Sequence, residues 1–195
     1  MSRDYIIHTP DEIERIRVAA AMTGKARDLI ADSVRPGMST KELDLIAGEI
    51  ITSMGGKCAF LGYAGFPGNI CISVNDEVVH GIGDPNRFIL KGDLVKVDVG
   101  VAFNGGIGDT ARTVYVGDEP SCPADERKLM DITRDALEAG IKAALPGNHI
   151  RDISAAIQQV AKKNGIAIVR DFVGHGCGVK LHEPPEVPNY VTPMR

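Results

Sequence analysis

Apolar residues recur at helical spacing in two segments near the N-terminus of the chain. Residues 11–34 carry an apolar side chain every three or four positions, and the pattern ends at Pro36-Gly37. Residues 39–54 begin with a Ser-Thr-Lys-Glu sequence typical of a helix N-terminus. Apolar residues at helical spacing follow it, and the segment ends before Gly55-Gly56. The pattern predicts two helices joined by a short connector.

The same succession of helix, Pro-Gly and helix returns in the second part of the chain. Residues 125–145 and 150–163 have helical apolar spacing, with Pro146-Gly147 between them and Gly165 after them. Pro146 and Gly165 each lie 110 positions after a counterpart in the first part, so we expect an internal duplication. The expected organisation is a single catalytic-type domain over 1–195, with a first half-repeat at 11–118 and a truncated second one at 122–195.

Between the helix pairs the hydrophobic period changes to that of strands. Residues 71–74, 94–103 and 110–116 are rich in Val, Ile and Thr. Asn104-Gly105 is a strong signal for a two-residue hairpin turn. The order of elements predicts an α+β fold, in which helices cover one face of an antiparallel or mixed sheet.

Composition and charge narrow the class of protein. The 195 residues are 44% hydrophobic and 25% charged, with a net charge of −4 and no Trp. These values suit a globular protein and argue against a specific nucleic-acid binder, which needs clustered basic or stacking side chains. The N-terminus resembles no signal peptide and no apolar run is long enough for a membrane span. The four cysteines show no CxxC spacing, so we expect reduced thiols and a cytoplasmic protein.

Two aspartates of the predicted hairpin are candidates for metal binding. If Asn104-Gly105 forms a two-residue turn, Asp98 lies opposite Ala111, and Asp109 becomes its diagonal neighbour on the same face. Two like charges on one face of an apolar strand suit a bound cation. The alternative is a strand aspartate that is solvated or paired with Arg112.

Three of the five histidines lie in glycine-rich segments. His80 precedes Gly81, whereas His175 is enclosed by glycines and lies seven positions before His182. Glycines leave room for a ligand or metal beside an imidazole. No local zinc motif is present, so from the residues alone these histidines are equally compatible with ligands and with ordinary surface or core positions.

Three motifs together carry a resemblance to a known family. SVNDEVVHGIG, VKVDVGVAFNGGIGDTART and VGHGCGVKLHEPPEVPNY resemble the successive motifs of type I methionine aminopeptidase, in order and with similar spacing. The resemblance runs from about Asp11 to the last residue. It implies the pita-bread fold, a pseudo-twofold repeat of helix-helix-strand halves around a curved sheet, here with an incomplete second half.

The resemblance also assigns chemical roles. It implies that Asp98 and Asp109 are the chelating and bridging carboxylates of a two-metal site, and that His175 is the imidazole ligand. It implies that His80 and His182 contact substrate and stabilise the tetrahedral intermediate. The implied reaction is removal of an N-terminal methionine by a metal-bridged hydroxide, with Co, Mn, Fe or Zn as the metal.

A narrow methionine pocket is the other implied feature. Tyr63, Phe66, Cys71 and Leu181 match the positions that line it, although a Phe is more usual at Leu181. Gly83 stands where Pro is common, a departure that affects loop stiffness. The implied partners are the N-terminal peptides of nascent proteins, with action at the ribosome and no membrane or specific nucleic acid.

The implied ligand set extends beyond the residues present. The family's site has two further glutamate ligands, one of which is also the general base, and neither Glu183 nor Glu186 lies in that motif. Because the duplication should extend past Arg195, we expect the chain to be C-terminally short and impaired in activity. The alternative hypothesis is a non-catalytic, partner-binding relative of the fold.

Overall fold

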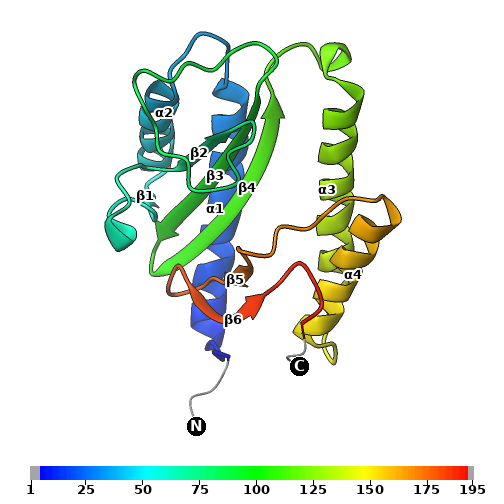
Figure 1. Cartoon of the computed structure of the whole chain (residues 1–195). Helices are drawn as coiled ribbons and strands as arrows, with labels where there is room; N and C mark the ends of the chain where they lie inside the picture. The colour runs from blue at the N-terminus through cyan, green and yellow to red at the C-terminus, as the bar shows by residue number, and fades with distance from the viewer. Residues whose placement is uncertain (1–4, 193–195) are drawn as a thin grey trace. The chain divides into compact units, whose positions relative to one another are not determined.

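The computed structural model of the chain describes residues 5–192 and divides into two compact units (Figure 1). The N-terminal unit comprises Ile7–Cys122 together with Cys177–His182. The C-terminal unit consists mainly of Pro123–Gly176 and the residues from Glu183 on. Each unit has its own secondary structure and is described by itself.

Two capped helices begin the N-terminal unit. α1 spans Pro10–Ser33, and the Thr9 side chain accepts a hydrogen bond from the backbone N–H three residues on. α2 spans Thr40–Ser53, and the Ser39 hydroxyl accepts the N–H of Glu42 at 3.1 Å. These caps satisfy N–H groups that lack a partner inside the helix. Both predicted helices are confirmed.

A four-stranded antiparallel sheet completes this unit, with β1 and β2 along one edge of β3 and β4 along the other. The turn between β3 and β4 consists of Asn104 and Gly105, with φ of +49° and +77° as a type I′ hairpin requires. The predicted hairpin is confirmed, but β4 begins four residues earlier than expected because pairing resumes directly after the turn. The strands are β1 (Lys57–Cys58), β2 (Cys71–Val74), β3 (Leu94–Phe103) and β4 (Gly106–Tyr115).

One face of this sheet forms the main core with α1 and α2. Alternate side chains of β3 point to this face, as the two-residue period of a strand requires. They pack against apolar side chains of both helices. The largest fully buried side chains of this core are Ile30, Leu43, Ile51, Ile70, Ile72, Ile89, Val95, Val97, Val99 and Val101.

Glycines of β4 allow α1 to approach the sheet closely. A Cβ atom added at Gly108 would lie 2.4 Å from Thr23 Oγ1 and 2.6 Å from Ala20 Cα. At Gly106 it would lie 2.5 Å from the carbonyl oxygen of Arg15. The backbone of β4 therefore packs directly against that of α1.

Replacing Gly108 with Val is expected to lower the free energy of unfolding by about 2–3 kcal/mol, because the added methyl groups force α1 away from the sheet. Urea unfolding followed by circular dichroism measures this change. Gly24 of α1 is the matched control, since no atom lies within 4 Å of an added Cβ. Gly24→Ala should raise the free energy of unfolding by about 0.5–1 kcal/mol. Equal effects at both positions would contradict this account of the packing.

The C-terminal unit contains a pair of helices and a short two-stranded sheet. α3 spans Ala124–Ala143, and α4 spans Ile150–Lys163. α4 begins 110 positions after the start of α2 and has the same length, 14 residues. β5 (Gly174–Gly176) pairs antiparallel with β6 (Glu183–Val187). Ser154 of α4 donates a 2.6 Å hydrogen bond to the carbonyl that follows β6.

Short turns and strands were not predicted from the sequence. The 3-10 turns η1 (Tyr63–Gly65) and η2 (Glu119–Ser121), and the strands β1 and β6, have at most five residues each. A hydrophobic period cannot be recognised in so few residues. Within residues 5–192, no helix is long and apolar enough to cross a membrane.

Candidate functional site

The face of the sheet opposite α1 brings the two candidate aspartates together. Asp98 pairs with Ala111, and Gly100 pairs with Asp109, so the two carboxylates are diagonal neighbours across the β3–β4 ladder. The register expected from the Asn104-Gly105 turn is confirmed. The same alternation that buries the valines of β3 against the helices therefore directs both aspartates to the other face.

The carboxyl groups of Asp98 and Asp109 are in hydrogen-bonding contact. Burial, the charge of Asp109 and this hydrogen bond together raise the pKa of Asp98 to about 7. Ionising both of two adjacent carboxyl groups is electrostatically unfavourable unless a cation lies between them. Carboxylate oxygens are ligands for hard and borderline divalent metals, so the chemistry of this pair suits such an ion.

The alternative pairing of Asp98 with Arg112 is wrong. Arg112 lies opposite Val97, on the face of the sheet that packs against α1. Its guanidinium lies 3.3 Å from the carboxylate of Asp28 in that helix. The pleat of the sheet thus separates Arg112 from Asp98.

An apolar cluster occupies the same face of the sheet as the aspartates. It contains three of the four side chains predicted to line the pocket, namely Phe66, Cys71 and Leu181. Cys71 lies directly opposite Asp98 in the β2–β3 ladder, so the cluster borders the carboxylates. We call this set the pocket cluster, and its members are Ala59, Phe60, Phe66, Cys71, Ile107, Cys177 and Leu181.

The Cys71 thiol in the pocket cluster is held in its neutral form. Burial and the nearby charges of Asp98 and Asp109 raise its pKa to about 12. A neutral thiol behaves as a small apolar group, whereas a thiolate would be a nucleophile or a metal ligand. The surroundings of Cys71 therefore favour its predicted role in lining a pocket.

A distant segment of the chain, residues 177–182, supplies part of this site. Ile107 donates its N–H to the Gly178 carbonyl at 2.7 Å, which ties the segment to β4. Leu181 is 4% exposed in the pocket cluster. The next residue, His182, lies with its Nδ1 at 2.9 Å from the Tyr63 hydroxyl. The fourth predicted pocket residue, Tyr63, thus contacts a predicted substrate-binding histidine.

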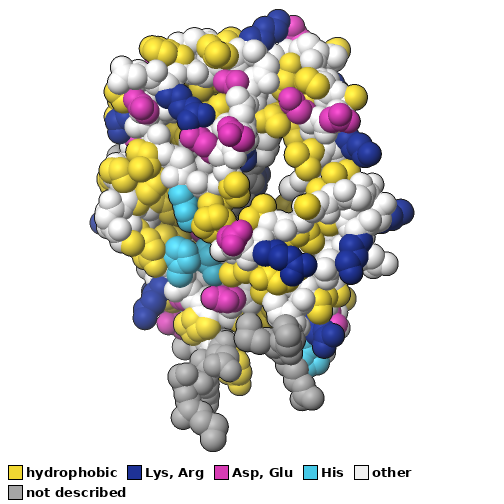
Figure 2. Space-filling view, viewed as in Figure 1, with side chains coloured by type: hydrophobic (Ala, Val, Ile, Leu, Met, Phe, Trp, Pro, Cys, Tyr) yellow, Lys and Arg dark blue, Asp and Glu magenta, His cyan; other side chains and the backbone are white. Residues whose placement is uncertain are grey.

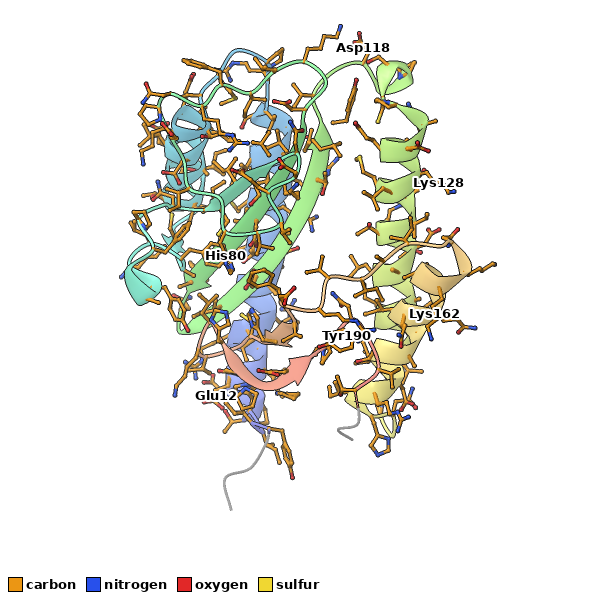
Figure 3. The ribbon with its side chains drawn as sticks, in the orientation of Figure 1. Glu12, His80, Asp118, Lys128, Lys162 and Tyr190 are labelled. Carbon is orange, nitrogen blue, oxygen red and sulfur yellow. The ribbon has the colours of Figure 1, made fainter. Side chains whose placement is uncertain are left out.

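His80 lies in the loop that passes beside β2 (Figure 3). The following residue, Gly81, accepts the N–H of Ile72 and donates to Ser73 Oγ, at 2.9 and 3.0 Å. A Cβ at Gly81 would lie 2.0 Å from the Ile72 carbonyl oxygen, so only glycine permits this approach. His80 has a φ of +60° and is exposed, and exposed imidazoles are visible in Figure 2. The loop therefore presents an accessible imidazole next to the strand that carries Cys71.

His175 belongs to β5 of the C-terminal unit. It pairs with Glu186, and its Nδ1 lies 3.0 Å from the Gly176 carbonyl oxygen. In the part of the chain that the structure describes, no three His, Cys, Asp or Glu side chains are grouped to hold a metal ion. Asp98 and Asp109 are a pair of neighbouring carboxyl groups that the N-terminal unit itself brings together.

Some members of the site were not found from the sequence. Ile107 belongs to the pocket cluster. It lies two residues before Asp109 in β4, and residues two apart in a strand point to the same face, so its position could have been predicted. Phe60 is 8% exposed and packs under Gly100, but it lies in a loop without periodicity. Asp44 is fully buried and holds the loop that carries Phe66 of the pocket cluster, and its helical position gave no indication of that contact.

Comparison with known proteins places the chain in a family. The model of metallopeptidase family M24 matches residues 14–195. A methionine aminopeptidase of Clostridium perfringens is 45% identical over 97% of this chain and 75% of its own, and methionine aminopeptidase 1 of Bacillus subtilis is 41% identical with the same coverage. The crystal structure of the Thermotoga maritima methionine aminopeptidase superposes with a TM-score of 0.91 at 38% identity, covering 97% of this chain and 75% of that one.

These relatives confirm the α+β, pita-bread assignment of the fold. They also agree with the local structure, because the paired aspartates of β3 and β4 lie beside the pocket cluster within the matched residues. The chain therefore belongs to metallopeptidase family M24, and within that family to the methionine aminopeptidases.

Proposed function

We propose that this protein removes the N-terminal methionine from peptides in a reaction that depends on divalent metal ions. The observation that carries the proposal is the contact between Asp98 and Asp109 at the border of the pocket cluster. The methionine aminopeptidases that resemble the chain support it. The proposed substrates are nascent proteins as they leave the ribosome, and the proposed compartment is the cytoplasm.

Asp98 and Asp109 would hold the metal, with His175 as the imidazole ligand that the family resemblance implies. Carboxylates with one imidazole suit Mn, Fe, Co or Zn. When bound, such ions polarise the scissile carbonyl and lower the pKa of a water molecule towards neutrality. The elevated pKa of Asp98 in the metal-free protein means that metal binding releases a proton near neutral pH.

The pocket cluster would bind the side chain of the first residue. Phe66, Cys71 and Leu181 present an aromatic ring, a neutral thiol and a branched alkyl group, and all three make favourable contacts with a thioether. Tyr63 is 45% exposed beside them and would border the opening. An unbranched methionine side chain suits such a pocket better than a charged or β-branched one.

His80 and His182 would act on the peptide bond that is cleaved. Water adds to the carbonyl carbon of the methionine, the C–N bond to the second residue breaks, and a proton passes to the released amine. Negative charge develops on the carbonyl oxygen during the addition. An imidazole N–H from either histidine would donate a hydrogen bond to that oxygen and stabilise it.

A peptide hydrolysis assay tests this proposal. The 195-residue protein with added Mn²⁺ is expected to release free methionine from Met-Ala-Ser, and chelation should stop the release until metal is restored. The release should be slow, because the two further glutamate ligands that the resemblance implies, one of them the general base, are not among its residues. The acetylated peptide, N-acetyl-Met-Ala-Ser, is the matched control substrate because it lacks the free α-amine. Release of methionine from both peptides at the same rate, or no release with any divalent metal, would overturn the proposal.

A further inference from the structure

The contact between Tyr63 and His182 joins two rings that are 119 residues apart in the sequence. The hydroxyl oxygen of Tyr63 lies 2.9 Å from His182 Nδ1. The two rings are also stacked, with centroids 5.1 Å apart and an angle of 27° between their planes. One tyrosine therefore limits both the tilt of the imidazole and the hydrogen bonding of its Nδ1 atom.

The backbone holds Tyr63 in place from both sides. Tyr63 donates its N–H to the Phe60 carbonyl at 2.9 Å, and Phe66 donates its N–H to the Tyr63 carbonyl at the same distance. Gly62 and Gly65, with φ of +81° and +84°, permit this tight turn. The phenol ring therefore extends from a closed loop whose neighbours, Phe60 and Phe66, are anchored in the pocket cluster.

His182 is held as firmly on the other side. It follows Leu181, which is buried in the pocket cluster, and the segment before it is tied to β4 through the Gly178 carbonyl. Gly178 also donates its N–H to the Lys180 carbonyl at 3.1 Å, which closes the segment on itself. The Tyr63–His182 contact thus forms between two constrained backbones, which reduces the entropy lost in making it.

We propose that Tyr63 is a positioning residue that fixes the tautomer of His182. The phenol O–H is a hydrogen-bond donor, and a ring nitrogen that carries no proton is an acceptor, so in this arrangement the Tyr63 hydroxyl donates and Nδ1 accepts. A neutral imidazole carries one proton, which must then reside on Nε2. The Nε2–H group becomes the donor that His182 offers to the carbonyl oxygen of a substrate, a consequence that rests on the proposed function.

The tautomer of His182 can be measured without any activity. Long-range proton–nitrogen NMR correlations of the ¹⁵N-labelled 195-residue protein distinguish the two tautomers, and His182→Gln identifies the resonances of this ring among the five histidines. In its neutral form, the wild-type ring is expected to carry its proton on Nε2. Tyr63→Phe keeps the stacked ring but removes the hydroxyl, so the Nδ1 resonance should move and the second tautomer should become populated.

Kinetics supply the functional part of the test. Tyr63→Phe is expected to lower kcat for Met-Ala-Ser by about 10- to 100-fold, by analogy with the loss of a group that orients a metal-bound imidazole, with KM changed less than about twofold. Tyr115→Phe is the matched control, because its hydroxyl donates a 3.0 Å hydrogen bond to the Ser121 carbonyl at the far end of β4. This control should leave both the His182 spectrum and kcat unchanged.

Two results would overturn the proposal. A proton on Nδ1 in the wild-type protein would mean that His182 donates to Tyr63, and an unchanged His182 spectrum in Tyr63→Phe would mean that the hydroxyl has no influence on the ring. A wild-type protein that releases no methionine would count against the proposed function instead, and the NMR measurement would still decide the tautomer.

Discussion

Replacing Asp98 with Asn is expected to weaken Mn²⁺ binding by more than about 100-fold and to abolish methionine release. Removing a group that only orients a metal ligand already costs about 10- to 100-fold, and Asp98 is proposed to contact the metal itself. Isothermal titration of the metal-free protein with Mn²⁺ measures the affinity. Asp118→Asn is the control, since it makes the same change in charge at an exposed carboxylate 3.6 Å from Lys91.

The same substitution is expected to stabilise the protein when chelator is present. Asp98 has a pKa of about 7 in the folded protein, whereas the unfolded carboxyl ionises near pH 4. The wild-type protein therefore loses stability as the pH rises from about 4 to about 7, because the unfolded state releases this proton first. The free energy of unfolding of Asp98→Asn should therefore exceed that of the wild-type protein by an amount that grows over this pH range to about 2–4 kcal/mol and stays constant above it.

Thermal or urea unfolding at several pH values in chelator checks this second effect. If the variant loses metal affinity and gains stability, the carboxylate pair serves metal binding and lowers the free energy of unfolding of the metal-free protein. Loss of stability in Asp98→Asn at every pH would instead indicate that Asp98 has a structural role, and would contradict the proposed metal site.

Asp44→Ala is expected to give the largest loss of stability, about 3–5 kcal/mol. Asp44 is fully buried, and its Oδ1 accepts the backbone N–H groups of Asn69 and Ile70 at 2.6 and 3.2 Å. Its Oδ2 lies 2.8 Å from Lys41 Nζ. Removing the carboxylate would leave two N–H groups without a partner at the end of the loop that leads into β2.

The Lys41 partner provides the control for this prediction. Its side chain is 37% exposed, so Lys41→Met should cost no more than about 1 kcal/mol, as expected for an ion pair near the surface. Urea unfolding of both variants separates the two contributions. Equal losses would show that the ion pair, and not the pair of backbone N–H groups, accounts for the stabilising effect of Asp44.

Asp44 also connects stability with the site. The loop that it anchors carries Tyr63 and Phe66, and the adjacent backbone at Gly83 lies so close that an added Cβ would be 2.9 Å from the Cβ of Asp44. The glycine at position 83, where the family resemblance suggested proline, is therefore explained by packing against α2. A change at Asp44 is expected to disturb both loops that border β2.

Local features of this fold could be predicted because they depend on neighbouring residues. Apolar spacing and capping residues defined the four helices to within a few positions. The Asn104-Gly105 turn set the register of the hairpin, and that register placed Asp98 and Asp109 on one face. Turn conformation and strand alternation are short-range properties, so a single sequence was sufficient to specify them.

The resemblance to a family supplied what periodicity could not. Nothing in the spacing of Phe66 or Leu181 indicated a pocket, and the motifs proposed both before the structure placed them in one cluster. The resemblance did not indicate Phe60, which packs under Gly100 from an irregular loop. Contacts of this kind depend on side chains from several elements that meet only after folding.

The sequence by itself determined the helices, the hairpin, the facing aspartates and the family to which the chain belongs. Only the tertiary structure decided that Arg112 turns away from Asp98, that Asp44 anchors the loop carrying Phe66, and that Tyr63 contacts His182. The physical reason is the range of the interactions. Turns and caps are fixed by residues a few positions apart, whereas a buried carboxylate or an oriented imidazole depends on partners that packing brings from distant parts of the chain.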